Sequence, residues 1–590
     1  MILQALKEYY DRKAADSASG IAPLGWEWKE IPFLVNLSAR GEFIRIEDTR
    51  EGKSAKPFLV PTLGESKGNG IKSNFPWENA EYIFGIPLKE DKNNAVPKRK
   101  EEFRARLKEY SAQDWAKAIL TFLQSADIAR IAAANKNEWT QITKGAYMLF
   151  AIHGIPVSNL DSFKQCYHLP AGQQCVCLAT GKQDALKEKE PPIKGTGFFK
   201  VIPTENIKSE LHIVSFNEEA FTSFKKKQGQ NAPIGQIASF AYTNALNHLL
   251  RKNSRQKMQV GDATTVFWSS WDSNLEDEFG DFFDEPPTDN PDKGVDAVAR
   301  LLASVKTGAF SQEDFTTRFY VLGLSPNSAR IAVRFWHEGT VAEMERRFAD
   351  WFENLRISHG PKDKEHLSLT QLLLSVALHN NDYQKWKANI PPNLAGAVMR
   401  SILDGTPYPA TLLSSAIVRI KAEHDVTYPR AKLIKAFINH NLNPERKLAM
   451  SLDKDNTNVG YRLGRLFAVL ERIQCEAAKP TKLNATIRDK FYASASATPA
   501  AVFGNLMRLK NHHLAKLEKT RFFEDIIGEI AAGIQVFPPH LSLNEQGMFA
   551  IGYYHQRQDF FTGKQAKANG ADEAAPTTGS DDAVQTELSL

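Results

Sequence analysis

Residues 461–474, "YRLGRLFAVLERIQ", decide how the C-terminal half of the chain should be interpreted. Apolar residues recur there every three or four positions, which places them on one face of a helix. They are Leu463, Leu466, Phe467, Leu470 and Ile473. The arginines of the same stretch cluster on another face. The pattern predicts an amphipathic helix that packs through its apolar face.

Later segments of the sequence show the same amphipathic helical pattern. Later segments, "AAVFGNLMRLKNHHLAKLEK" and "RFFEDIIGEI", are again helical and partly apolar. Between Lys454 and Arg521 there are 13 Lys and Arg against 5 Asp and Glu. A bundle packed through Leu and Phe would leave these cations in a basic groove outside. The sequence therefore predicts a C-terminal helical bundle with a basic surface.

The N-terminal part mixes both kinds of periodicity. "FIRIEDTR" alternates like a strand, whereas "KEDKNNAVPKRKEEFRARLKEY" passes from a charged loop into a helix. Residues 160–230 combine turn signals with short apolar runs and predict a small β-containing segment. "NAPIGQIASFAYTNALNHLL" predicts a helix, with Asn231 as a possible cap and Pro233 in the first turn. The predicted fold class is α+β.

The domain organisation follows from these shifts in pattern. Residues 274–294 hold eight acidic residues and three prolines, which predicts an exposed linker or an acidic docking surface for a basic partner. The predicted regions are an N-terminal mixed α/β region (1–270), an acidic linker (271–294), a helical middle region (295–449), a basic helical bundle (450–562) and a disordered tail (563–590).

Bulk composition narrows the class of protein. With 590 residues the chain is long enough for several domains, and its net charge of +5 means that affinity for nucleic acid must come from local clusters. Four cysteines form no disulfide framework. We find no signal peptide and no apolar span of membrane length, so a cytoplasmic protein without membrane contact is expected.

A glycine-rich stretch, residues 64–85, raises the question of phosphate binding. It reads "GESKGNGIKSNFPWENAEYIFG". A nucleotide-binding P-loop needs four residues between its glycines and then Lys directly after the second glycine. Here five residues separate Gly64 from Gly70, and Ile71 precedes Lys72. The spacing excludes this nucleotide pocket, and the glycines also miss the dinucleotide fingerprint.

Metal and catalytic signals are equally weak. Cys166, His168, Cys175 and Cys177 could supply soft ligands, but the Cys-x-Cys spacing is tighter than zinc sites use. We expect reduced thiols, no metal and no cofactor. No nucleophile elbow or zincin motif nominates a catalytic centre, so an enzyme is not expected.

A binding function remains for the glycine-rich stretch. Lys67 and Lys72 can neutralise phosphates, and Asn74 and Asn79 can hydrogen-bond base edges. The aromatics that follow Asn74 could wedge against a base step or anchor the loop on the core. A plain surface loop is the alternative to DNA or RNA contact.

A second candidate is "LGLSPNSARIAVRFW", residues 322–336. Ser325 can cap a helix with Pro326 in its first position, which would place Arg330 and Arg334 on one face. These arginines are predicted contacts to the DNA backbone. An ordinary solvated helix face is the alternative.

Taken together, several segments resemble a known family. They include "MILQALKEYYDR", "GIKSNFPWENAEYIFG", "SFNEEAFTSF", "FYVLGLSPNSARIAVRFW", "YRLGRLFAVLERIQ" and "HLSLNEQGMFAIGYYHQRQDF". In this order they resemble the large subunit of the type I-C CRISPR surveillance complex, called Cascade, from Met1 to about Phe560. The acidic stretch and the tail carry no family pattern.

The resemblance implies a non-catalytic subunit of an RNA-guided antiviral ribonucleoprotein. Such a subunit sits at the crRNA 5′ end beside other Cascade subunits and reads the protospacer-adjacent motif (PAM) in double-stranded target DNA. It helps to form the R-loop, stabilises the displaced single strand and presents the target to a separate helicase–nuclease. It also implies a separately translated C-terminal product, for which Met450 is a plausible start.

Site residues follow from the resemblance and from the charge pattern. The motif-reading loop of the family corresponds to Asn69, Gly70, Lys72, Asn74 and Asn79. Candidates for displaced-strand contact are Arg462, Arg465, Arg488, Lys490, Arg508 and Lys510. Two rival functions are an assembly scaffold that does not read DNA, and a nuclease or nucleotide-driven enzyme.

Overall fold

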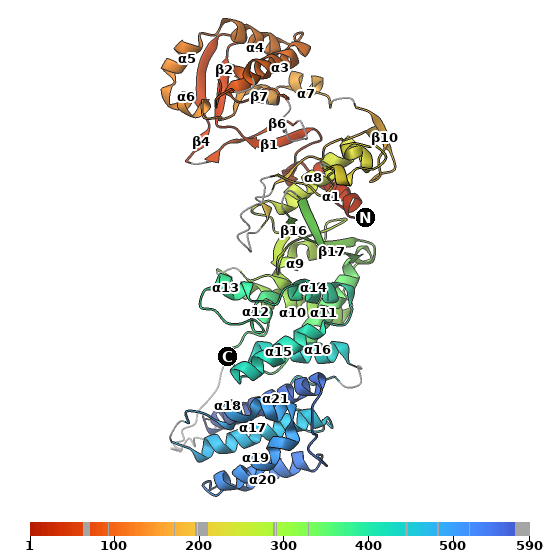
Figure 1. Ribbon diagram of the computed structural model, residues 1–590, viewed down its shortest axis with the longest axis vertical. Coiled ribbons are helices and arrows are strands. Elements are labelled where there is room, and N and C mark those ends of the chain that lie inside the picture. Colours follow the sequence, from red (N-terminus) through yellow and green to blue (C-terminus); the bar gives the residue numbers. More distant parts are fainter. Residues whose placement is uncertain are drawn as a thin grey trace, which may run out of the picture. The chain divides into compact units, whose positions relative to one another are not determined.

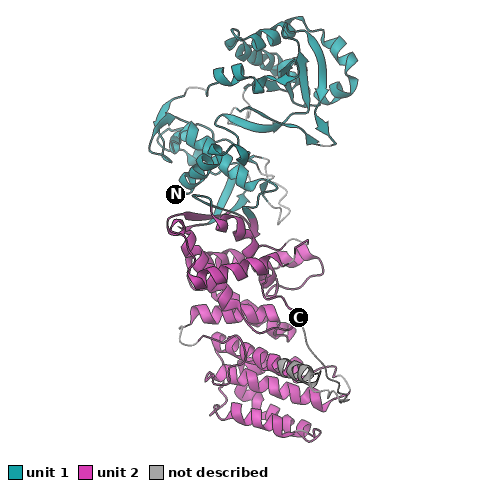
Figure 2. Ribbon diagram, turned by 180° about the vertical axis from the view of Figure 1, so that it is seen from behind, with its two compact units in different colours: residues 1–257, 266–272, 324–336 teal, residues 258–265, 273–323, 337–590 magenta. Residues whose placement is uncertain are grey.

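The computed structural model describes most of the chain in two compact units (Figure 2). Unit 1 comprises 1–257, 266–272 and 324–336, and unit 2 comprises 258–265, 273–323 and 337–590. The residues outside the description are 53, 63–70, 92–93, 170–171, 195–196, 199–209, 217, 287–288, 291, 328–329, 443–446, 481–482, 519 and 573–590, together with the side chains of 562–572.

Unit 1 contains a mixed sheet in the order β3-β2-β8-β7. Its strands are β2 (Phe33–Leu37), β3 (Phe43–Asp48), β7 (Trp77–Glu78) and β8 (Met148–Ile152). Strands β2 and β8 run parallel, with Phe33 opposite Met148, whereas β3 and β7 are antiparallel to their neighbours. The strand predicted from "FIRIEDTR" is confirmed as β3. The central strands β2 and β8 are buried almost throughout.

Six helices of the described chain accompany this sheet. They are α2 (Ala80–Ile83), α3 (Ala95–Glu109), α4 (Asp114–Ser125), α5 (Ile128–Ala134), α6 (Lys136–Ile142) and α7 (Asp161–Cys166). Those labelled α3, α4, α5 and α6 lie beside it in Figure 1. The helix predicted after the charged loop is confirmed as α3. The other strands of the unit are β1 (Trp26–Glu30), β4 (Arg50–Glu51), β5 (Ser54–Ala55), β6 (Pro57–Pro61), β9 (Ile155–Pro156), β10 (Gln174–Val176), β11 (Gln183–Ala185), β12 (Ile193–Lys194) and β13 (Glu210–Leu211).

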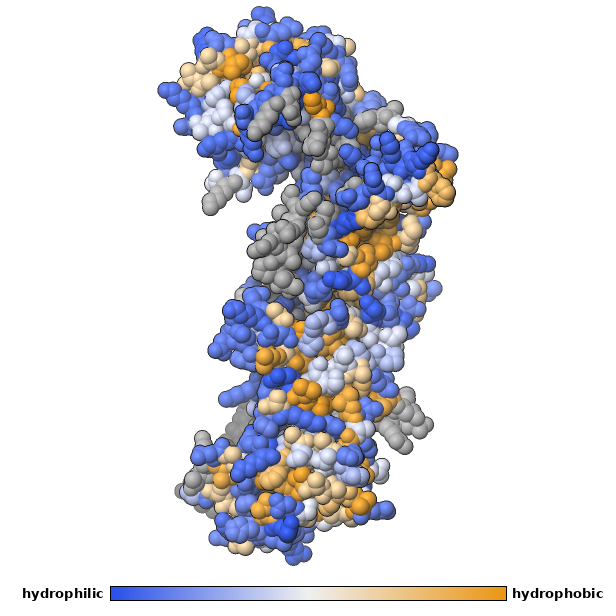
Figure 3. Space-filling view, viewed as in Figure 1, coloured by the Kyte–Doolittle hydropathy of each residue, from blue (hydrophilic) through white to orange (hydrophobic). Residues whose placement is uncertain are grey.

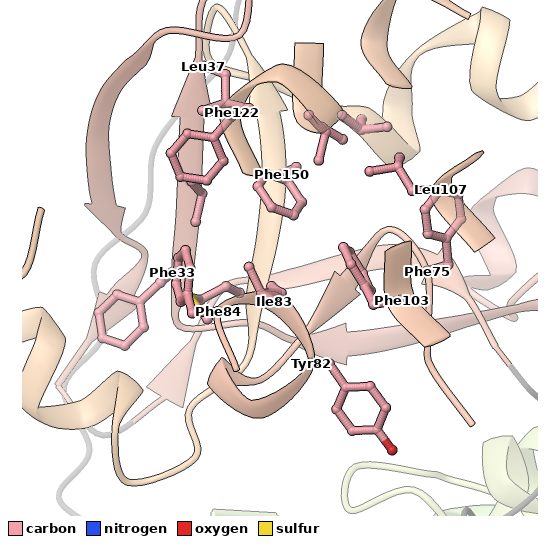
Figure 4. Close-up of a cluster of buried hydrophobic side chains, with 14 of the residues drawn as sticks. Phe33, Leu37, Phe75, Tyr82, Ile83, Phe84, Phe103, Leu107, Phe122 and Phe150 are labelled. Carbon is pink, nitrogen blue, oxygen red and sulfur yellow. The ribbon is translucent and has the colours of Figure 1, made fainter. Parts of the chain in front are cut away.

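An aromatic core joins the sheet to these helices (Figure 4). Phe75 is 1% exposed and stacks on Tyr110, with ring centroids 5.2 Å apart. Phe103 of α3 and Phe122 of α4 contact Phe150 of β8. The labelled Tyr82 directs its hydroxyl away from the cluster in Figure 4. Burial of so many rings provides a rigid platform for the loop that leads into Phe75.

The helix predicted over 231–250 starts later than expected. Helix α8 (Gln236–Leu250) packs against α1 (Ile2–Ala15), and its cap residue is Gly235. The prediction of Asn231 as cap and of Pro233 in the first turn is wrong. The carbonyls of Pro233 and Ile234 accept backbone bonds from Leu178 and Lys187, so these residues pair with the β10–β11 hairpin.

Residues 318–327 and 330–340 form strands, whereas a helix was predicted from Ser325 onward. Strands β16 (Arg318–Asn327) and β17 (Arg330–Thr340) are neighbours in one sheet, so the helix start at Ser325 is wrong. The run of residues 319–325 is buried throughout, which a half-exposed helix would not allow. Strands β14 (Lys257–Val260) and β15 (Ala263–Ser269) also contribute to both units.

Unit 2 is mainly helical. It contains α9 (Asn274–Phe283), α10 (Lys293–Thr307), α11 (Val341–Leu355), α12 (Leu369–Leu374), α13 (Tyr383–Ala388), α14 (Leu394–Asp404), α15 (Ala410–Glu423), α16 (Tyr428–Asn441), α17 (Val459–Ala477), α18 (Ile487–Ala497), α19 (Pro499–Leu514), α20 (Thr520–Ala531) and α21 (Leu543–Asp572). The α+β class with a helical C-terminal half is confirmed.

The first half of the acidic stretch is a helix, α9, and not an exposed linker. Ser273 caps α9 by accepting from the Glu276 N–H, and Phe279, Phe282 and Phe283 are buried on one face. Aromatic residues spaced by three and four positions drive this helix onto the core despite its charge. Some carboxylates on the other face are paired, as Asp281 is with Lys293 at 2.7 Å.

The C-terminal bundle is built around α17 and α21. The helix predicted from 461–474 is confirmed, and its five apolar residues are all at most 3% exposed. Helix α21 continues to Asp572, into the stretch predicted as a disordered tail. No helix among the described residues combines the length and apolar character needed to cross a bilayer.

Candidate nucleic-acid interface

The described part of the glycine-rich stretch changes abruptly from exposed to buried. Lys72 is exposed, whereas the six residues from Ser73 to Glu78 are buried. Phe75 and Trp77 lie in the core, and the Trp77 indole N–H donates to the Pro61 carbonyl at 3.0 Å. The aromatics therefore anchor the loop and do not project as a base wedge. The predicted positions Lys67, Asn69 and Gly70 lie outside the described residues.

A buried carboxylate organises the exit of this loop. Glu78 is 0% exposed, and its Oε1 accepts from the backbone N–H of Asn74 at 3.0 Å and from the Asn74 Nδ2 at 3.2 Å. Asn74 is only 7% exposed. The prediction that Asn74 presents its amide to a base edge is wrong in this structure, because that amide is directed inward to Glu78.

Asn79 also has an internal role. Its side-chain oxygen accepts from the Glu81 N–H at 3.0 Å and caps α2, while its own backbone N–H donates to Glu78 Oε2 at 2.9 Å. An N-cap satisfies a helix amide that has no partner within the helix. The structure therefore uses Asn79 to start a helix, and the predicted base contact through its side chain is wrong in this structure.

Lys72 lies at a cleft of about 470 Å³ within unit 1. Thr62, directly before segment 63–70, and Lys72, two residues after it, both line the cleft. Arg106 of α3 and Lys187 add two cations, and Arg106 also donates to the Ser73 carbonyl. Sequence reasoning missed both, because nothing in the local sequence shows that they lie near Lys72.

Carboxylates and a phenol also line this cleft. Glu102 and Glu109 come from α3, and Tyr110 follows that helix. Burial is the main cause that raises the pKa of the Tyr110 hydroxyl, so this wall presents a neutral donor and acceptor. Cations for phosphates and carboxylates for base amino groups are thus brought to one surface.

Arg330 and Arg334 lie on a strand, not on the predicted helix. Because alternate residues of a strand share a face, both arginines still lie on one side of β17. The Arg330 guanidinium lies 4.0 Å from the ring centroid of Phe221. Arg334 is exposed, and its guanidinium donates to the Ser325 hydroxyl at 3.4 Å.

Two of the six predicted displaced-strand residues are not on the surface. Arg465 is 1% exposed and pairs with Glu529 at 2.9 Å, while its Nε donates to Gln556 at 3.1 Å. Lys510 is 9% exposed and pairs with Glu524 at 3.1 Å. Their predicted place in an outer basic groove is wrong, because both cationic side chains are buried and paired with carboxylates of the same bundle.

The other four predicted residues differ in how accessible they are. Arg462 is half-buried and donates to the Asn456 carbonyl at 2.8 Å. Arg488 lies 3.1 Å from Asp425 and 3.6 Å from Glu471. Lys490 and Arg508 are exposed on α18 and α19. These last two are the best placed to meet a strand outside the bundle.

The cysteines do not converge on a metal site in the described part of the chain. No group of three or more His, Cys, Asp or Glu side chains suited to a metal ion occurs there. Cys166, Cys175 and Cys177 are free thiols, and burial raises the pKa of the Cys166 thiol. The Cys166 thiol contacts the Phe163 carbonyl at 3.3 Å, as a packed thiol does.

Comparison with protein families identifies a match to this sequence. The model of the family described as "CRISPR-associated protein (Cas_Csd1)" matches residues 6–561. A search of curated proteins found no match. The family match covers nearly the whole chain and therefore includes both the cleft of unit 1 and the C-terminal bundle.

Proposed function

Because the chain belongs to the Cas_Csd1 family, the large subunits of type I-C Cascade, we propose that it reads the protospacer-adjacent motif in target DNA at the cleft of unit 1. One observation supports the cleft of unit 1 as the site of motif reading. Thr62, directly before segment 63–70, and Lys72, two residues after it, line the cleft together with Arg106 and Lys187.

The chemistry of the cleft suits a duplex edge. Lys72 and Lys187 act as point charges for phosphates, whereas Glu102 and Glu109 can accept from the amino groups of cytosine or adenine. The loop is held on an aromatic core, so DNA meets a preorganised surface. Protein groups then read a short motif while guide pairing reads the remaining sequence.

The rest of the proposed function concerns the assembled complex. The subunit lies at the crRNA 5′ end beside other Cascade subunits, assists duplex opening, holds the displaced single strand and supports recruitment of a helicase–nuclease. It carries out no catalysis itself. The C-terminal bundle, which starts after Met450, also serves as a separate small-subunit product.

Lys72→Gln is expected to weaken binding of the assembled complex to every duplex target. Loss of one phosphate contact lowers the slope of log affinity against log salt by about 0.9 and leaves the preference between correct and mutated motifs unchanged. Fluorescence anisotropy at several salt concentrations measures both. Lys117→Gln, at an exposed lysine of α4 that pairs with Asp114, is the matched control. An unchanged slope for Lys72→Gln would exclude this phosphate contact.

Lys490→Gln with Arg508→Gln is expected to impair strand holding only. Both side chains are exposed on the bundle, so their loss should reduce permanganate reactivity of thymines in the displaced strand while motif preference stays intact. Lys385→Gln, at an exposed lysine of α13, is the control. If the footprint keeps its intensity in an assembled complex, these two residues do not hold the strand.

An assembly scaffold remains the second candidate, and one observation favours it. The side chains of Asn74 and Asn79 are engaged inside the subunit. If both Lys72→Gln and Arg106→Gln leave duplex affinity and motif preference unchanged in an intact complex, the scaffold function is favoured over motif reading.

A further inference from the structure

One aromatic side chain of unit 1 is presented to solvent in an unusual way. Phe224 is 93% exposed, whereas most phenylalanines of the chain are buried. It lies in a turn between two short 3-10 helices, Glu219–Phe221 and Gln228–Asn231. Exposed apolar residues are common on protein surfaces, and Figure 3 shows several hydrophobic patches among hydrophilic residues on one face. Phe224 differs because the turn that carries it is fixed by specific contacts.

Asn231 fixes this turn. Its side-chain oxygen accepts from the Ser223 N–H at 3.0 Å, and its Nδ2 donates to the carbonyls of Lys226 at 3.2 Å and Gln228 at 3.0 Å. A further backbone bond joins Lys226 N–H to the Ser223 carbonyl at 2.9 Å. The residue expected to cap a helix therefore closes the turn that displays Phe224.

The backbone of the turn is itself unusual. Phe224 and Lys225 have φ values of 51° and 60°, in the left-handed region that side chains other than glycine rarely adopt. Such a conformation is strained and persists where surrounding contacts impose it. Its effect is to direct the ring of Phe224 into solvent, where it covers no apolar surface of the protein.

Cations follow Phe224 in the sequence, and a further cation contacts the nearby Phe221. Lys225, Lys226 and Lys227 follow directly and are all exposed. Arg330 of β17 stacks on Phe221, three residues before Phe224. Glu218 and Glu219 offset part of this charge, but they lie at the start of the segment, before the turn.

The turn is fastened close to a residue of the cleft. The Gly229 N–H donates to the Glu188 carbonyl at 2.9 Å, and a Cβ at Gly229 would lie 2.3 Å from the Lys187 carbonyl. Only glycine permits this approach. Because Lys187 lines the cleft, the aromatic turn is attached to the wall at which the proposed function places duplex DNA.

We propose that residues 221–227 form a binding site for unpaired nucleotides of single-stranded DNA, with Phe224 as the stacking platform. Every base has a face that stacks on an aromatic ring, and the three lysines can meet consecutive phosphates without requiring duplex geometry. The inference rests on the proposed function, since a strand separated at the cleft would emerge beside this turn. No base-specific hydrogen bond is needed, so the site is tolerant of sequence.

Phe224→Ala in the full chain tests the stacking step. Loss of one base stack corresponds to about a ten-fold drop in affinity for a thymidine oligonucleotide, measured by fluorescence anisotropy. Phe224→Trp should retain affinity, because a larger ring still stacks. The native chain should bind an abasic oligonucleotide more weakly than the thymidine one, and Phe224→Ala should remove that difference.

Controls separate this inference from its alternatives. Phe522→Ala removes another exposed phenylalanine, on α20, and should change nothing. Replacement of Lys225, Lys226 and Lys227 by Gln should lower the salt slope by about 2, since each single-strand phosphate contributes about 0.7. Equal affinity of Phe224→Ala and the native chain overturns the proposal. Tighter, Phe224-dependent binding of a uridine oligoribonucleotide would assign the turn to RNA and overturn the assignment to DNA.

The failure of this inference and of the proposed function can be told apart. In the assembled complex, Phe224→Ala should leave the preference for the correct adjacent motif intact, because that preference belongs to the cleft. If the stacking prediction fails while Lys72→Gln behaves as expected, only the aromatic turn is excluded. If Phe224→Ala abolishes motif preference, the turn belongs to the motif-reading site and the separate single-strand site is overturned.

Discussion

Gly464→Leu is expected to separate α17 from α21 and to destabilise the C-terminal bundle by at least about 3 kcal/mol. A Cβ at Gly464 would lie 2.0 Å from the Phe549 carbonyl oxygen and 2.8 Å from the Tyr553 nitrogen. Both atoms belong to backbone, so no rotamer change can relieve the overlap. The two helices must move apart and lose the contacts between their buried faces.

The same closeness recurs along this pair of helices. A Cβ at Gly460 would lie 2.5 Å from the Glu545 carbonyl oxygen, and one at Gly552 would lie 2.1 Å from that of Tyr461. Glycines on both helices therefore allow the backbones to approach. One larger side chain at Gly464 disturbs a contact that the neighbouring glycines also need.

Hydrogen exchange followed by mass spectrometry measures the expected loss in the full chain. Peptides of α17 and α21 should lose protection in Gly464→Leu, while those of the sheet in unit 1 keep theirs. Gly504→Leu is the matched control, because Gly504 also lies in a helix but a Cβ there meets nothing within 4 Å. Native protection of α17 in Gly464→Leu would show that the helices are packed differently.

In this bundle, helix periodicity predicts the helices correctly. It does not predict which of their cations are buried. The spacing in 461–474 predicts α17 and its buried face correctly. It cannot show that Arg465 turns inward, because the partners Glu529 and Gln556 lie far along the chain. A buried arginine is tolerated only when such partners are present, and these are set by tertiary packing.

Elsewhere, competing local signals explain the errors. Ser325 and Pro326 form a good helix start, yet the apolar run before them belongs to a strand buried on both faces. The acid-rich composition of 274–294 indicated a linker, although three phenylalanines at helical spacing drive α9 into the core. In both segments burial of apolar side chains outweighs the local preference.

At the candidate site, the predicted phosphate contact of Lys72 stays a prediction. Lys72 is exposed at the cleft, as a phosphate contact requires, but Arg106 and Lys187 were not foreseen. Glycine and asparagine in a loop suggest accessible amides. The apolar Phe75 and Trp77 that follow Asn74 instead carry the chain inward, and the Asn74 amide is buried with them.

Glu78→Ala is expected to have the second large effect, about 3 kcal/mol on the stability of unit 1 together with loss of Lys72-dependent DNA binding. Within the described part of the chain, the carboxylate accepts two hydrogen bonds from Asn74 and one from Asn79. Its removal leaves buried N–H donors without that partner, at a cost of about 1–3 kcal/mol for each group that stays unsatisfied. The turn that presents Lys72 then loses its fixed position.

Two further variants, Glu78→Gln and Asn74→Ala, show how much each hydrogen bond of Glu78 contributes to stability and to DNA binding. Glu78→Gln keeps one acceptor oxygen but turns an NH₂ group toward a donor, so its stability should fall between those of the native chain and Glu78→Ala. Asn74→Ala removes one of the three bonds and leaves the backbone N–H paired. If Asn74 serves only as a support, this variant lowers the unfolding free energy by about 1 kcal/mol and preserves the ratio of affinities for correct and mutated motifs. Chemical denaturation of the chain and duplex titration of the complex measure the two quantities. A Glu78→Ala protein of native stability, or an Asn74→Ala complex that has lost motif preference at native stability, would contradict the supporting role and return Asn74 to the reading surface.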